Sequence, residues 1–418
     1  MEKYLLPEIA NFHKIDIYES HGGYDAFKSI FTRQPAEITD EVKKSNLRGR
    51  GGACFYTGLK WTFMPKDNAR PKYLCVNGDE SEPGTFKDRQ LFEFNPHQVI
   101  EGILIACYAM GIKTAYVYIR GEYGKWIKLL QKAVDDAYAK NYIGKNILGT
   151  NFSTDIFLHK GAGAYICGEE SALMNSLEGD RGYPRVKPPF PAQKGLWGCP
   201  TTINNVETLA NVPIIIKKGW EWFSNYGNQK HPGPILVGIS GHVNKPGVYE
   251  IPTGVKITDL IYDENYGGGV LDGKKIKAII PGGSSTMILP ADKIENVTMD
   301  FDSLKSAGSS IGTAGLIVMN EDTDLIEVIT RITKFYHHES CGQCTPCREG
   351  TGWMEKILHR FENGNAKIED IDLLLDVANN IEGNTICALG DAAAWPVQSM
   401  IKRFRNEFEE KVNAAKPL

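Results

Sequence analysis

Three cysteines stand three residues apart in one short segment, at Cys341, Cys344 and Cys347. Thiolates at this spacing can bind three irons of a four-iron cubane cluster, whose fourth iron needs a ligand from elsewhere in the chain. Cys387 is the only other cysteine in the C-terminal half and is a candidate for that ligand, although a buried structural thiol would fit it equally. Zinc sites also use such spacing, but more often as two separated pairs. The segment therefore predicts a metal centre and favours an iron-sulfur cluster.

A second candidate site is the glycine-rich stretch of residues 48–61, which reads Arg-Gly-Arg-Gly-Gly-Ala-Cys-Phe-Tyr-Thr-Gly-Leu-Lys-Trp. Backbone N–H groups of small residues can approach an anion closely, cationic side chains can pair with it, and aromatic side chains can stack on a ring. This combination suits the phosphate of a nucleotide or a flavin. A flexible glycine-rich turn with solvated charges is the alternative interpretation.

Residues 161–171 form another glycine-rich stretch, after a predicted strand and before a predicted helix. A dinucleotide-binding fingerprint would place its third glycine at Ile166, so the stretch does not match that motif. Glu169 and Glu170 at the helix start would repel a phosphate and suit hydroxyl groups or a ribose. Residues 77–82 contain three carboxylates after an earlier strand, which indicates either a ligand site at a strand end or a solvated acidic loop.

Alternating strands and helices are predicted around these stretches. Apolar runs predict strands at residues 73–77, 114–119 and 155–158, and helical periodicity predicts helices at residues 97–110 and 122–140. This order is typical of an α/β layer, which binds ligands at the carboxyl ends of its strands. The acidic loop and the second glycine-rich stretch both follow such ends.

The rest of the chain divides by its residue pattern. Residues 1–58 show no sustained period and are interpreted as a lead-in rather than an independent domain. Residues 233–290 are rich in Val, Ile, Gly and turn residues, with strand-like pieces at 235–239 and 247–251, which predicts a small α+β domain. From Asp322 onward about four helical segments are predicted, interrupted by a cysteine loop at residues 340–348.

Composition and charge exclude several classes of protein. Lys and Arg total 47 against 51 Asp and Glu, so the net charge of -4 gives no broad positive field for nucleic acid or an anionic membrane. The longest apolar run, residues 103–112, is far shorter than the roughly 20 residues of a spanning helix, and the N-terminus resembles no signal sequence. Nine cysteines in such a chain indicate thiols or metal ligands rather than disulfides. We expect a cytoplasmic protein without direct membrane insertion.

Several stretches together resemble one family, the NADH-binding flavoprotein subunit of respiratory complex I. They are residues 48–61, 77–84, 161–173, 183–209 and 339–350, with Cys387. The resemblance covers nearly the whole chain and implies an α/β FMN-binding domain, a small β-grasp (α+β) domain and a C-terminal α-helical bundle that carries the iron-sulfur cluster. The implied divisions are a lead-in with the glycine-rich FMN loop at 1–58, the FMN and NADH domain at 59–232, the β-grasp domain at 233–320 and the helical domain at 321–418.

The resemblance also implies roles for individual residues. FMN would be bound by Gly49, Arg50, Gly51, Gly52, Lys60, Asn77, Asp79, Gly168, Glu169, Asn204, Asn205 and Thr208. NADH would be bound by Phe55, Phe63, Glu80, Glu82, Glu170, Lys187 and Phe190, with Glu80 and Glu170 near the reacting atoms. A [4Fe-4S] cluster would be held by Cys341, Cys344, Cys347 and Cys387.

The implied reaction is the oxidation of NADH by hydride transfer to FMN, followed by single-electron transfer to the cluster and on to partner subunits towards quinone. No side chain is expected to act as a general base. A carboxylate such as Glu82 beside the adenosine ribose would accept its hydroxyl groups and repel the extra phosphate of NADPH, so NADH should be preferred. The implied partners are a small thioredoxin-like [2Fe-2S] subunit and a large iron-sulfur subunit, in a membrane-associated complex that places this chain peripheral to the inner membrane.

Two other interpretations stay open. A diaphorase subunit of an NAD-linked hydrogenase or formate dehydrogenase resembles the same family, and such chains often carry further thioredoxin-like or ferredoxin-like segments. This sequence has no further cysteine cluster, which favours complex I. A zinc-stabilised scaffold that binds a nucleotide without catalysis is a different class of protein.

The first glycine-rich loop departs from the pattern of the family. That loop usually reads Gly-Ala-Gly-Phe-Pro-Thr-Gly, and here Cys54 and Tyr56 replace the second Gly and the Pro. If the backbone at Cys54 has a positive φ, its side chain adds strain. A cysteine so near a flavin is also a potential target of oxidation.

Overall fold

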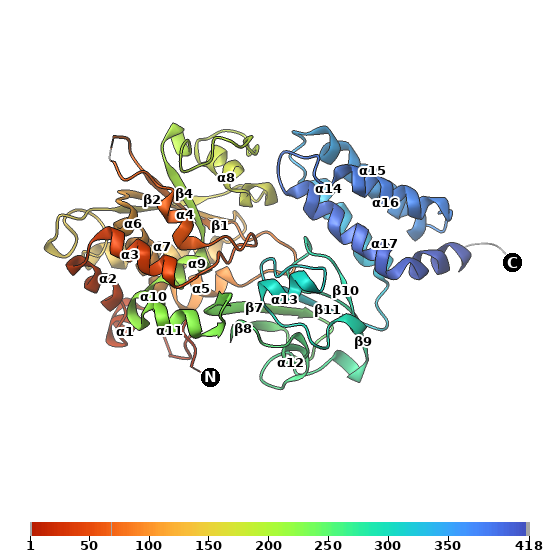
Figure 1. The fold of residues 1–418 in the computed structure, drawn as a ribbon, viewed down its shortest axis with the longest axis horizontal. Helices are drawn as coiled ribbons and strands as arrows, with labels where there is room; N and C mark the ends of the chain where they lie inside the picture. Colours follow the sequence, from red (N-terminus) through yellow and green to blue (C-terminus); the bar gives the residue numbers. More distant parts are fainter. Residues whose placement is uncertain (1, 68, 415–418) are drawn as a thin grey trace.

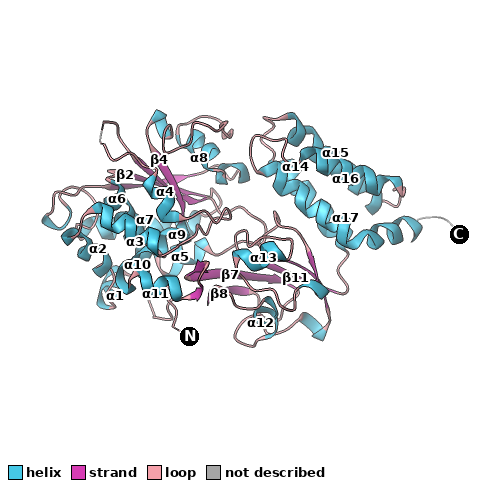
Figure 2. Ribbon diagram, viewed as in Figure 1, coloured by secondary structure: helices cyan, strands magenta, loops and turns pink. Residues whose placement is uncertain are grey.

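The computed structural model describes residues 2–67 and 69–414. Three parts follow one another along the chain: an α/β layer around a four-stranded sheet, a small domain around a five-stranded sheet, and a bundle of helices (Figures 1 and 2). The bundle lies to one side of the other two parts in Figure 1. The predicted order of an α/β part, an α+β part and a helical part is confirmed.

The first sheet is parallel, with the strand order β3-β2-β1-β4. Its strands are β1 (Tyr73–Gly78), β2 (Thr114–Ile119), β3 (Asp155–Lys160) and β4 (Thr201–Asn205). The first three lie where the apolar runs predict them. β4 is not predicted, because its residues Thr-Thr-Ile-Asn-Asn form no apolar run and only pairing with β1 makes them a strand.

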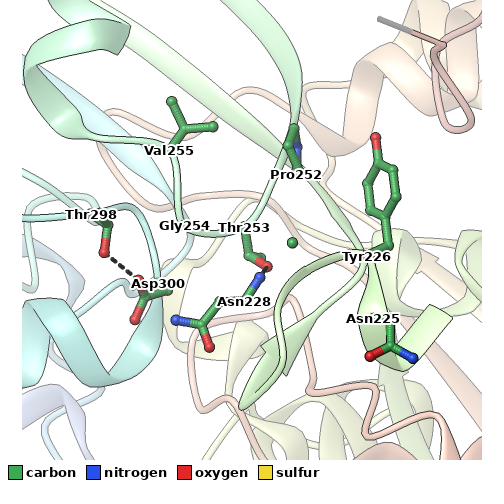
Figure 3. Close-up of a pocket in the computed structure, with 10 residues that line it drawn as sticks. Asn225, Tyr226, Asn228, Pro252, Thr253, Gly254, Val255, Thr298 and Asp300 are labelled. Carbon is green, nitrogen blue, oxygen red and sulfur yellow. Dashed lines mark hydrogen bonds between the residues drawn. The ribbon is translucent and has the colours of Figure 1, made fainter. Parts of the chain in front are cut away.

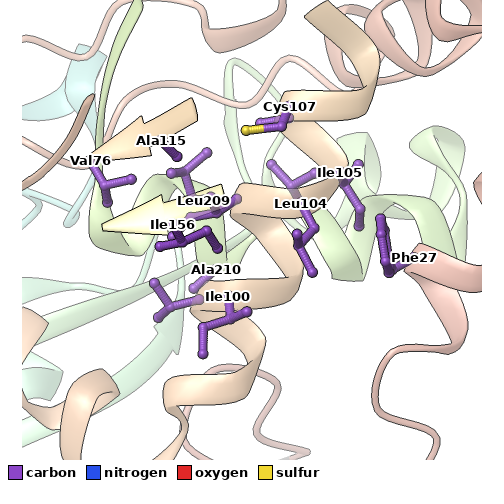
Figure 4. Close-up of a cluster of buried hydrophobic side chains, with 14 of the residues drawn as sticks. Phe27, Val76, Ile100, Leu104, Ile105, Cys107, Ala115, Ile156, Leu209 and Ala210 are labelled. Carbon is purple, nitrogen blue, oxygen red and sulfur yellow. The ribbon is translucent and has the colours of Figure 1, made fainter. Parts of the chain in front are cut away.

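Helices pack against this sheet and bury its side chains. Val76, Ala115 and Ile156 from neighbouring strands share one core with Ile100 and Leu104 of α6 (Figure 4). The helices after β1 are α5 (Asp88–Phe94), α6 (Pro96–Met110), α7 (Gly124–Ala139), α8 (Glu170–Leu177), α9 (Val206–Ala210), α10 (Val212–Lys218) and α11 (Trp220–Asn225). α6 is buried along nearly its whole length, because α3, α9 and α10 contact its other sides.

The lead-in is helical and belongs to the same core. Its helices are α1 (Ile15–Ser20), α2 (Asp25–Ser29) and α3 (Pro35–Lys44), and α4 (Thr57–Thr62) follows. Phe27 and Ile38 are fully buried in the core of the α/β layer. The sequence pattern does not predict α1 and α2 because they have only six and five residues, too few to show a period. The ten-residue α3 is also not predicted.

The small domain is built on a sheet with the strand order β10-β9-β11-β7-β8, in which only β7 and β11 are parallel. Its elements are β7 (Pro234–Gly241), β8 (Gly247–Pro252), α12 (Ile257–Tyr262), β9 (Ile276–Ile280), β10 (Leu289–Pro290), α13 (Phe301–Ser306) and β11 (Gly315–Asn320). A short hairpin of β5 (Gly227–Asn228) and β6 (His231–Pro232) precedes it. The two predicted strand-like pieces lie within β7 and β8.

The C-terminal bundle consists of α14 (Leu325–Glu339), α15 (Thr345–Glu362), α16 (Glu369–Ile381) and α17 (Leu389–Ala414). The predicted cysteine loop, residues 340–348, is shorter than expected. Pro346 lies in the first turn of α15, where its missing N–H is harmless, so Cys347 belongs to the helix. No helix in the described part of the chain is long and apolar enough to cross a membrane.

Candidate functional site

A cavity of about 290 Å³ lies at the carboxyl ends of β1 and β4. All three parts of the molecule line it. Asn77 at the end of β1 and Asp79 just after it belong to the α/β layer, Ser285 and Thr313 come from the small domain, and Cys387 comes from the bundle. Its position agrees with the rule that open α/β sheets bind ligands at the carboxyl ends of their strands.

The expected site residues divide into those that line this cavity and those that lie around it. Of the FMN set, the cavity is lined by Gly51, Asn77, Asp79, Gly168, Glu169 and Asn205, and not by Gly49, Arg50, Gly52, Lys60, Asn204 and Thr208. Of the NADH set, it is lined by Glu80 and Glu82, and not by Phe55, Phe63, Glu170, Lys187 and Phe190. Among the four cysteines, Cys387 lines it.

Residues 48–56 of the first glycine-rich stretch form a closed loop beside the cavity. Its ends meet in a short antiparallel bridge, and the Gly49 N–H donates to the Phe55 carbonyl at 2.8 Å. At the tip, Gly51 lies so close to Asn205 that an added Cβ would be 3.0 Å from the Asn205 Cβ. Gly52 has a φ of +110°. These close approaches explain why glycine stands at the tip.

The start of α9 holds the loop in place. The Asn205 side chain caps α9 by accepting from the Glu207 N–H at 2.9 Å. The Thr208 hydroxyl oxygen then accepts from the Arg50 N–H at 2.8 Å. The structure therefore brings Asn205 and Thr208 together with the loop, as expected for one binding site.

Two residues of the expected FMN set direct their side chains into the protein. The buried Arg50 guanidinium donates to the carbonyl oxygens of Pro232 at 2.7 Å and Pro234 at 3.3 Å. The Asn204 amide oxygen accepts from Trp61 Nε1 at 2.9 Å. Arg50 therefore contributes only its backbone on the side of the loop that meets α9.

Asp79 presents an acceptor that has no partner. Asn77 accepts from the Asp79 N–H at 3.0 Å and donates to the Gly168 carbonyl at 2.8 Å, which fixes the turn after β1. The Asp79 Oδ2 is buried and forms no hydrogen bond. Burial raises the pKa of Asp79 to about 7, although Arg120 opposes the shift. A buried carboxylate oxygen at a cavity wall suits a ligand hydroxyl group.

Glu80 is engaged by the protein rather than free for a ligand. Its Oε1 accepts from the backbone N–H groups of Lys87 and Asp88, both at 2.8 Å, and its Oε2 accepts from the Tyr123 hydroxyl at 2.9 Å. Burial and the neighbouring Asp88 raise the pKa of Glu80. The expected place of Glu80 at the cavity is found, but its oxygens hold the start of α5.

Glu82 joins the α/β layer to the small domain. Its Oε2 accepts from the Tyr165 hydroxyl at 2.7 Å, and its Oε1 accepts from the Ser285 N–H at 2.7 Å and the Ser284 hydroxyl at 3.3 Å. The Ser284 hydroxyl in turn lies 2.8 Å from that of Tyr336 on α14. Both oxygens of Glu82 are therefore occupied by protein donors.

A group of alternating charges surrounds the start of α8. Glu169 caps the helix, with its Oε2 accepting from the Ser171 N–H at 2.8 Å. Lys187 Nζ lies 3.0 Å from Glu169 and 2.7 Å from Glu170, and Lys60 Nζ lies 3.4 Å from Glu170. Burial alone would raise the pKa of Glu170, but the two lysines hold this pKa below its usual value. The four expected residues thus form one network.

Three phenylalanines of the expected NADH set are exposed. Phe55, Phe63 and Phe190 are 47%, 55% and 54% exposed, so none of them belongs to a core. The rings of Phe55 and Phe63 have centroids 6.1 Å apart at an angle of 46°. Exposed aromatic faces of this kind suit a stacked planar ligand.

The four expected cluster ligands lie close together in the bundle. Cys344 is the residue before α15, and Cys347 in its first turn contacts the Ser340 hydroxyl at 3.1 Å. Burial raises the pKa of Cys347 to about 11, and Cys344 and Cys341 add to the shift. Burial likewise raises the pKa of Cys387 to about 12, and Cys341 and Cys347 contribute.

The arrangement of the thiols can be compared with the two kinds of metal centre. In the described residues, no three His, Cys, Asp or Glu side chains converge on one ion position. In a cubane cluster each thiolate binds a different iron, so thiols that lie near one another without converging on one point suit it.

A second, open hollow of about 660 Å³ lies at the edge of the small domain (Figure 3). Thr253 and Asn228 lie on its wall, beside Thr298 and Asp300, and it shares no lining residue with the first cavity. Asp300 is engaged by the Ser303 N–H at 2.9 Å and by the Thr298 hydroxyl. We assign no chemistry to this hollow.

Family models match all three parts of the chain. Residues 42–214 match the Nuo51 FMN-binding domain, residues 236–328 match the SLBB domain, and residues 327–411 match the NADH-ubiquinone oxidoreductase-F iron-sulfur binding region. The small α+β domain is therefore an SLBB domain. The helical bundle is an iron-sulfur binding region.

Several relatives are similar over almost their whole length. The F subunit of NADH-quinone oxidoreductase from Rickettsia bellii (strain OSU 85-389) is 55% identical over 401 residues, which cover 96% of each chain. Its counterpart from Rickettsia typhi (strain Wilmington) is 55% identical over 395 residues, covering 94% of this chain and 93% of the relative. The chain belongs to the family of NADH-quinone oxidoreductase F subunits.

A solved structure shares the fold of this chain. The NAD+-reducing [NiFe]-hydrogenase in the H2-reduced state contains a chain that is 34% identical, with a TM-score of 0.84. The match covers 95% of this chain but 65% of the hydrogenase chain. The two chains therefore share a fold, and the match does not extend over the whole hydrogenase chain.

Membership of the NADH-quinone oxidoreductase family confirms the expected function and cofactors. The chain is the flavoprotein subunit of the NADH-oxidising module of complex I, and it contains an FMN-binding domain and a 4Fe-4S binding region. The residues present suit both groups, because Asp79 offers a buried acceptor without a partner and the cysteines offer four neighbouring thiols. The zinc scaffold is not supported.

Several residues that line the cavity of this flavoprotein are not expected from the sequence. Five of them are Lys87, Asp88, Thr85, Thr313 and Trp395. Lys87 and Asp88 follow the acidic loop closely. Charged residues beside a glycine- and acid-rich segment are only a weak sequence signal for a position at a cavity. Thr313 and Trp395 belong to other domains, so only the folded chain brings them to the cavity.

Proposed function

We propose that this chain binds FMN at the cavity through the loop of residues 48–56 and the turns after β1 and β4. The proposed FMN residues are Gly49, Arg50 through its backbone, Gly51, Gly52, Lys60, Asn77, Asp79, Gly168, Glu169, Asn205 and Thr208, with Asn204 supporting the site from behind. The partnerless Asp79 oxygen and the contact between Gly51 and Asn205 support this assignment. Asp79 would accept a ligand hydroxyl group, and the N–H groups at the loop tip, beyond Gly49 and Arg50, would face the phosphate.

We propose that NADH binds beside the flavin, with its planar end groups against the exposed rings of Phe55, Phe63 and Phe190. Lys187 and Glu170 at the start of α8 would contact its polar groups. Glu80 and Glu82 line the cavity, and we propose that they also shape it by holding α5 and the SLBB domain, whose donors their oxygens accept. Their contact with NADH stays a prediction.

Bound FMN supplies the chemistry that accepts a hydride from NADH and passes the two electrons on singly. The chain's residues bind and orient FMN and NADH and exclude water from the site. No side chain is proposed as a general base. We propose Cys341, Cys344, Cys347 and Cys387 as the ligands of the [4Fe-4S] cluster. One observation carries the whole proposal: Cys387 lines the same cavity as Gly51 and Asp79. A proposed cluster ligand therefore lies at the cavity where FMN is proposed to bind.

We also propose how the chain is divided and what it contacts. The proposed units are a lead-in at 1–58, an FMN and NADH domain at 59–232, a β-grasp domain at 233–320 and a helical domain at 321–418. Membership of complex I implies partner subunits, and we propose a small thioredoxin-like [2Fe-2S] subunit and a large iron-sulfur subunit. Exposed Trp353 and Ile386 on the bundle, the latter beside Cys387, support a contact there. The proposed location is cytoplasmic, peripheral to the inner membrane.

The test begins with the full chain, purified without oxygen after co-expression with the small partner subunit. We expect bound FMN, four irons for each chain in the bundle, and electron transfer from NADH to ferricyanide. Protein that holds neither FMN nor iron and does not reduce ferricyanide would overturn the proposal.

The ligand assignment has a separate test. Cys387→Ala should abolish the full cubane signal in electron paramagnetic resonance while FMN stays bound. Cys199→Ala is the matched control, because Cys199 is also partly exposed but lies outside the bundle. A normal cubane signal in the Cys387→Ala protein would refute Cys387 as the fourth ligand.

A further inference from the structure

The loop of residues 48–56 lies between two domains. On one side it contacts the start of α9 through Arg50 and Thr208. On the other side it meets the SLBB domain, where Gly52 lies near Thr313 and an added Cβ would be 3.7 Å from the Thr313 methyl group. The position of the loop therefore depends on the SLBB domain as well as on the FMN domain.

Cys54 inserts its side chain into the core of the SLBB domain. It is only 4% exposed, and all other members of its buried cluster lie between Ile235 and Val318. The thiol also borders a small space of about 10 Å³ with Ile311 and Ala314, so little room is left around it. No other residue of the loop joins this cluster.

The backbone at Cys54 opposes this insertion. Its φ is +52°, in the left-handed region that side chains other than glycine rarely adopt. The expected strain at this position is therefore present. Burial of the Cys54 side chain has to outweigh this backbone strain. These two opposing contributions determine whether the loop stays inserted in the SLBB domain.

A second contact fastens the same loop to the SLBB domain. The Arg48 guanidinium lies 4.4 Å from the centre of the Tyr56 ring and 4.6 Å from that of Phe301 on α13. Arg48 also donates to the Tyr56 hydroxyl at 2.9 Å and to the Lys230 carbonyl at 3.0 Å. Of the two residues that depart from the family pattern, Cys54 thus enters the SLBB domain directly, and Tyr56 is linked to it through Arg48.

We propose that Cys54 is a positioning residue that seats the glycine-rich loop in the SLBB domain, holds the loop tip at the cavity and thereby sets how slowly FMN is released. Tyr56 assists it through the stack with Arg48 and Phe301. This inference rests on the proposal that the loop binds FMN. The SLBB domain is then part of the flavin site, although Cys54 touches no cofactor itself.

The same geometry protects the thiol from modification. A buried thiol whose pKa is raised to about 11 by burial carries almost no thiolate at neutral pH. The expectation that Cys54 is an oxidation target is therefore not favoured while the loop is seated. Cys54 becomes reactive only when the loop leaves the SLBB domain, so alkylation of this thiol reports on loop opening.

The first experiment measures FMN release from the anaerobically purified, FMN-loaded chain and its variants, by flavin fluorescence after dilution. Cys54→Ala and Cys54→Gly should both release FMN about tenfold faster than the wild type. Cys54→Gly should lose less thermal stability than Cys54→Ala, because glycine adopts the left-handed backbone without strain. Unchanged release in both variants, or slower release in Cys54→Gly, overturns the proposal.

Controls separate this inference from the proposed function. Cys107→Ala removes an equally buried thiol from the core of the α/β layer, and it should leave FMN release unchanged. Gly51→Ala should weaken FMN binding, because the new Cβ meets Asn205 at 3.0 Å. If Gly51→Ala has no effect, the FMN loop is wrongly assigned. If it weakens binding and the Cys54 variants do not, only the present inference fails.

A second measurement needs no Cys54 variant and decides the case if those variants do not fold. Site-resolved alkylation by mass spectrometry on the wild type should modify Cys54 faster without FMN than with it. Tyr56→Ala, at a 37% exposed position, should increase the rate of Cys54 alkylation and of FMN release. Equal alkylation of Cys54 with and without FMN contradicts the proposal.

Discussion

At the scale of single residues, Asp79 is the titratable group whose surroundings bear most directly on the cavity. Its carboxylate has lost most of its contact with water, and one oxygen has gained no protein donor in return. A group in this state favours the protonated form, which is why its pKa is raised to about 7 from 3.8. The protein without cofactor therefore carries a destabilising charge that a bound ligand can relieve.

Asp79→Asn should make the cofactor-free protein more stable at pH 7.5. Between about pH 4 and pH 7 the folded state keeps a proton on Asp79 that the unfolded state has lost, so wild-type stability falls as pH rises through this window. The amide removes that titration. We expect a higher Tm than the wild type at pH 7.5 and a similar Tm near pH 4, measured by thermal unfolding across pH. The exposed substitution Asp135→Asn should show no such dependence, and a Tm difference that is constant with pH would contradict the account.

The site was only partly predictable at this scale. Residue types and spacing indicate which segments meet a ligand, and six residues of the expected FMN set do line the cavity. They cannot indicate where a side chain turns. Arg50 points to Pro232 and Pro234, which are 182 and 184 residues away, and Glu82 is occupied by Ser285, 203 residues away. Such partners exist only in the folded chain.

At the scale of elements, a buried ion cluster joins the start of α5 to α9. Lys87 Nζ lies 2.7 Å from Asp88 and 2.7 Å from Glu207, and all three side chains are almost fully buried. Asp88 also accepts from the Asn205 amide at 2.6 Å. The cluster therefore links the acidic segment after β1 to the residue against which the tip of the FMN loop packs.

Lys87→Met should destabilise the protein strongly. The substitution leaves Asp88 and Glu207 buried without their cation, which typically costs about 3–5 kcal/mol. The measurement is the free energy of unfolding from urea titration. Lys125→Met breaks the exposed pair with Glu93 and should change it by less than about 1 kcal/mol. Equal effects of the two substitutions would show that burial of the cluster is not what matters.

Elements with a long apolar run or a clear period were predictable, and those held only by tertiary contacts were not. α6 and β2 are apolar enough to be recognised alone. β4 is polar and becomes a strand through pairing with β1. The shortening of the cysteine loop has a local cause, since Pro346 begins α15 earlier than the spacing of the cysteines suggests.

At the scale of the whole molecule, the N-terminal segment is tied to the SLBB domain. The Glu250 carboxylate on β8 accepts from the backbone N–H groups of Tyr4 at 2.6 Å, Leu5 at 2.9 Å and Leu6 at 2.8 Å. Burial raises the pKa of Glu250, while these three donors oppose the shift. One side chain thus connects the first residues of the lead-in to a strand in another domain.

Glu250→Gln should loosen this connection locally. The amide keeps one acceptor oxygen, so at least one of the three N–H groups loses its partner, and its hydrogen exchange should become about tenfold faster. Hydrogen–deuterium exchange with mass spectrometry at residues 4–6 is the measurement. Glu264→Gln, on the exposed surface of the same domain, is the control and should leave these residues unchanged. Unaltered exchange at residues 4–6 in Glu250→Gln would contradict the account.

The contacts of Cys54 and of Glu250 set an order of events during biosynthesis. The FMN domain is synthesised first, but the cluster into which Cys54 inserts extends to Val318, and the Tyr4 N–H donates to a residue 246 positions later. Domains fold largely as they emerge from the ribosome. The nascent FMN domain therefore leaves the ribosome with an unseated loop and a loose N-terminus, and on the proposed assignment it retains flavin for long only after the SLBB domain has been made.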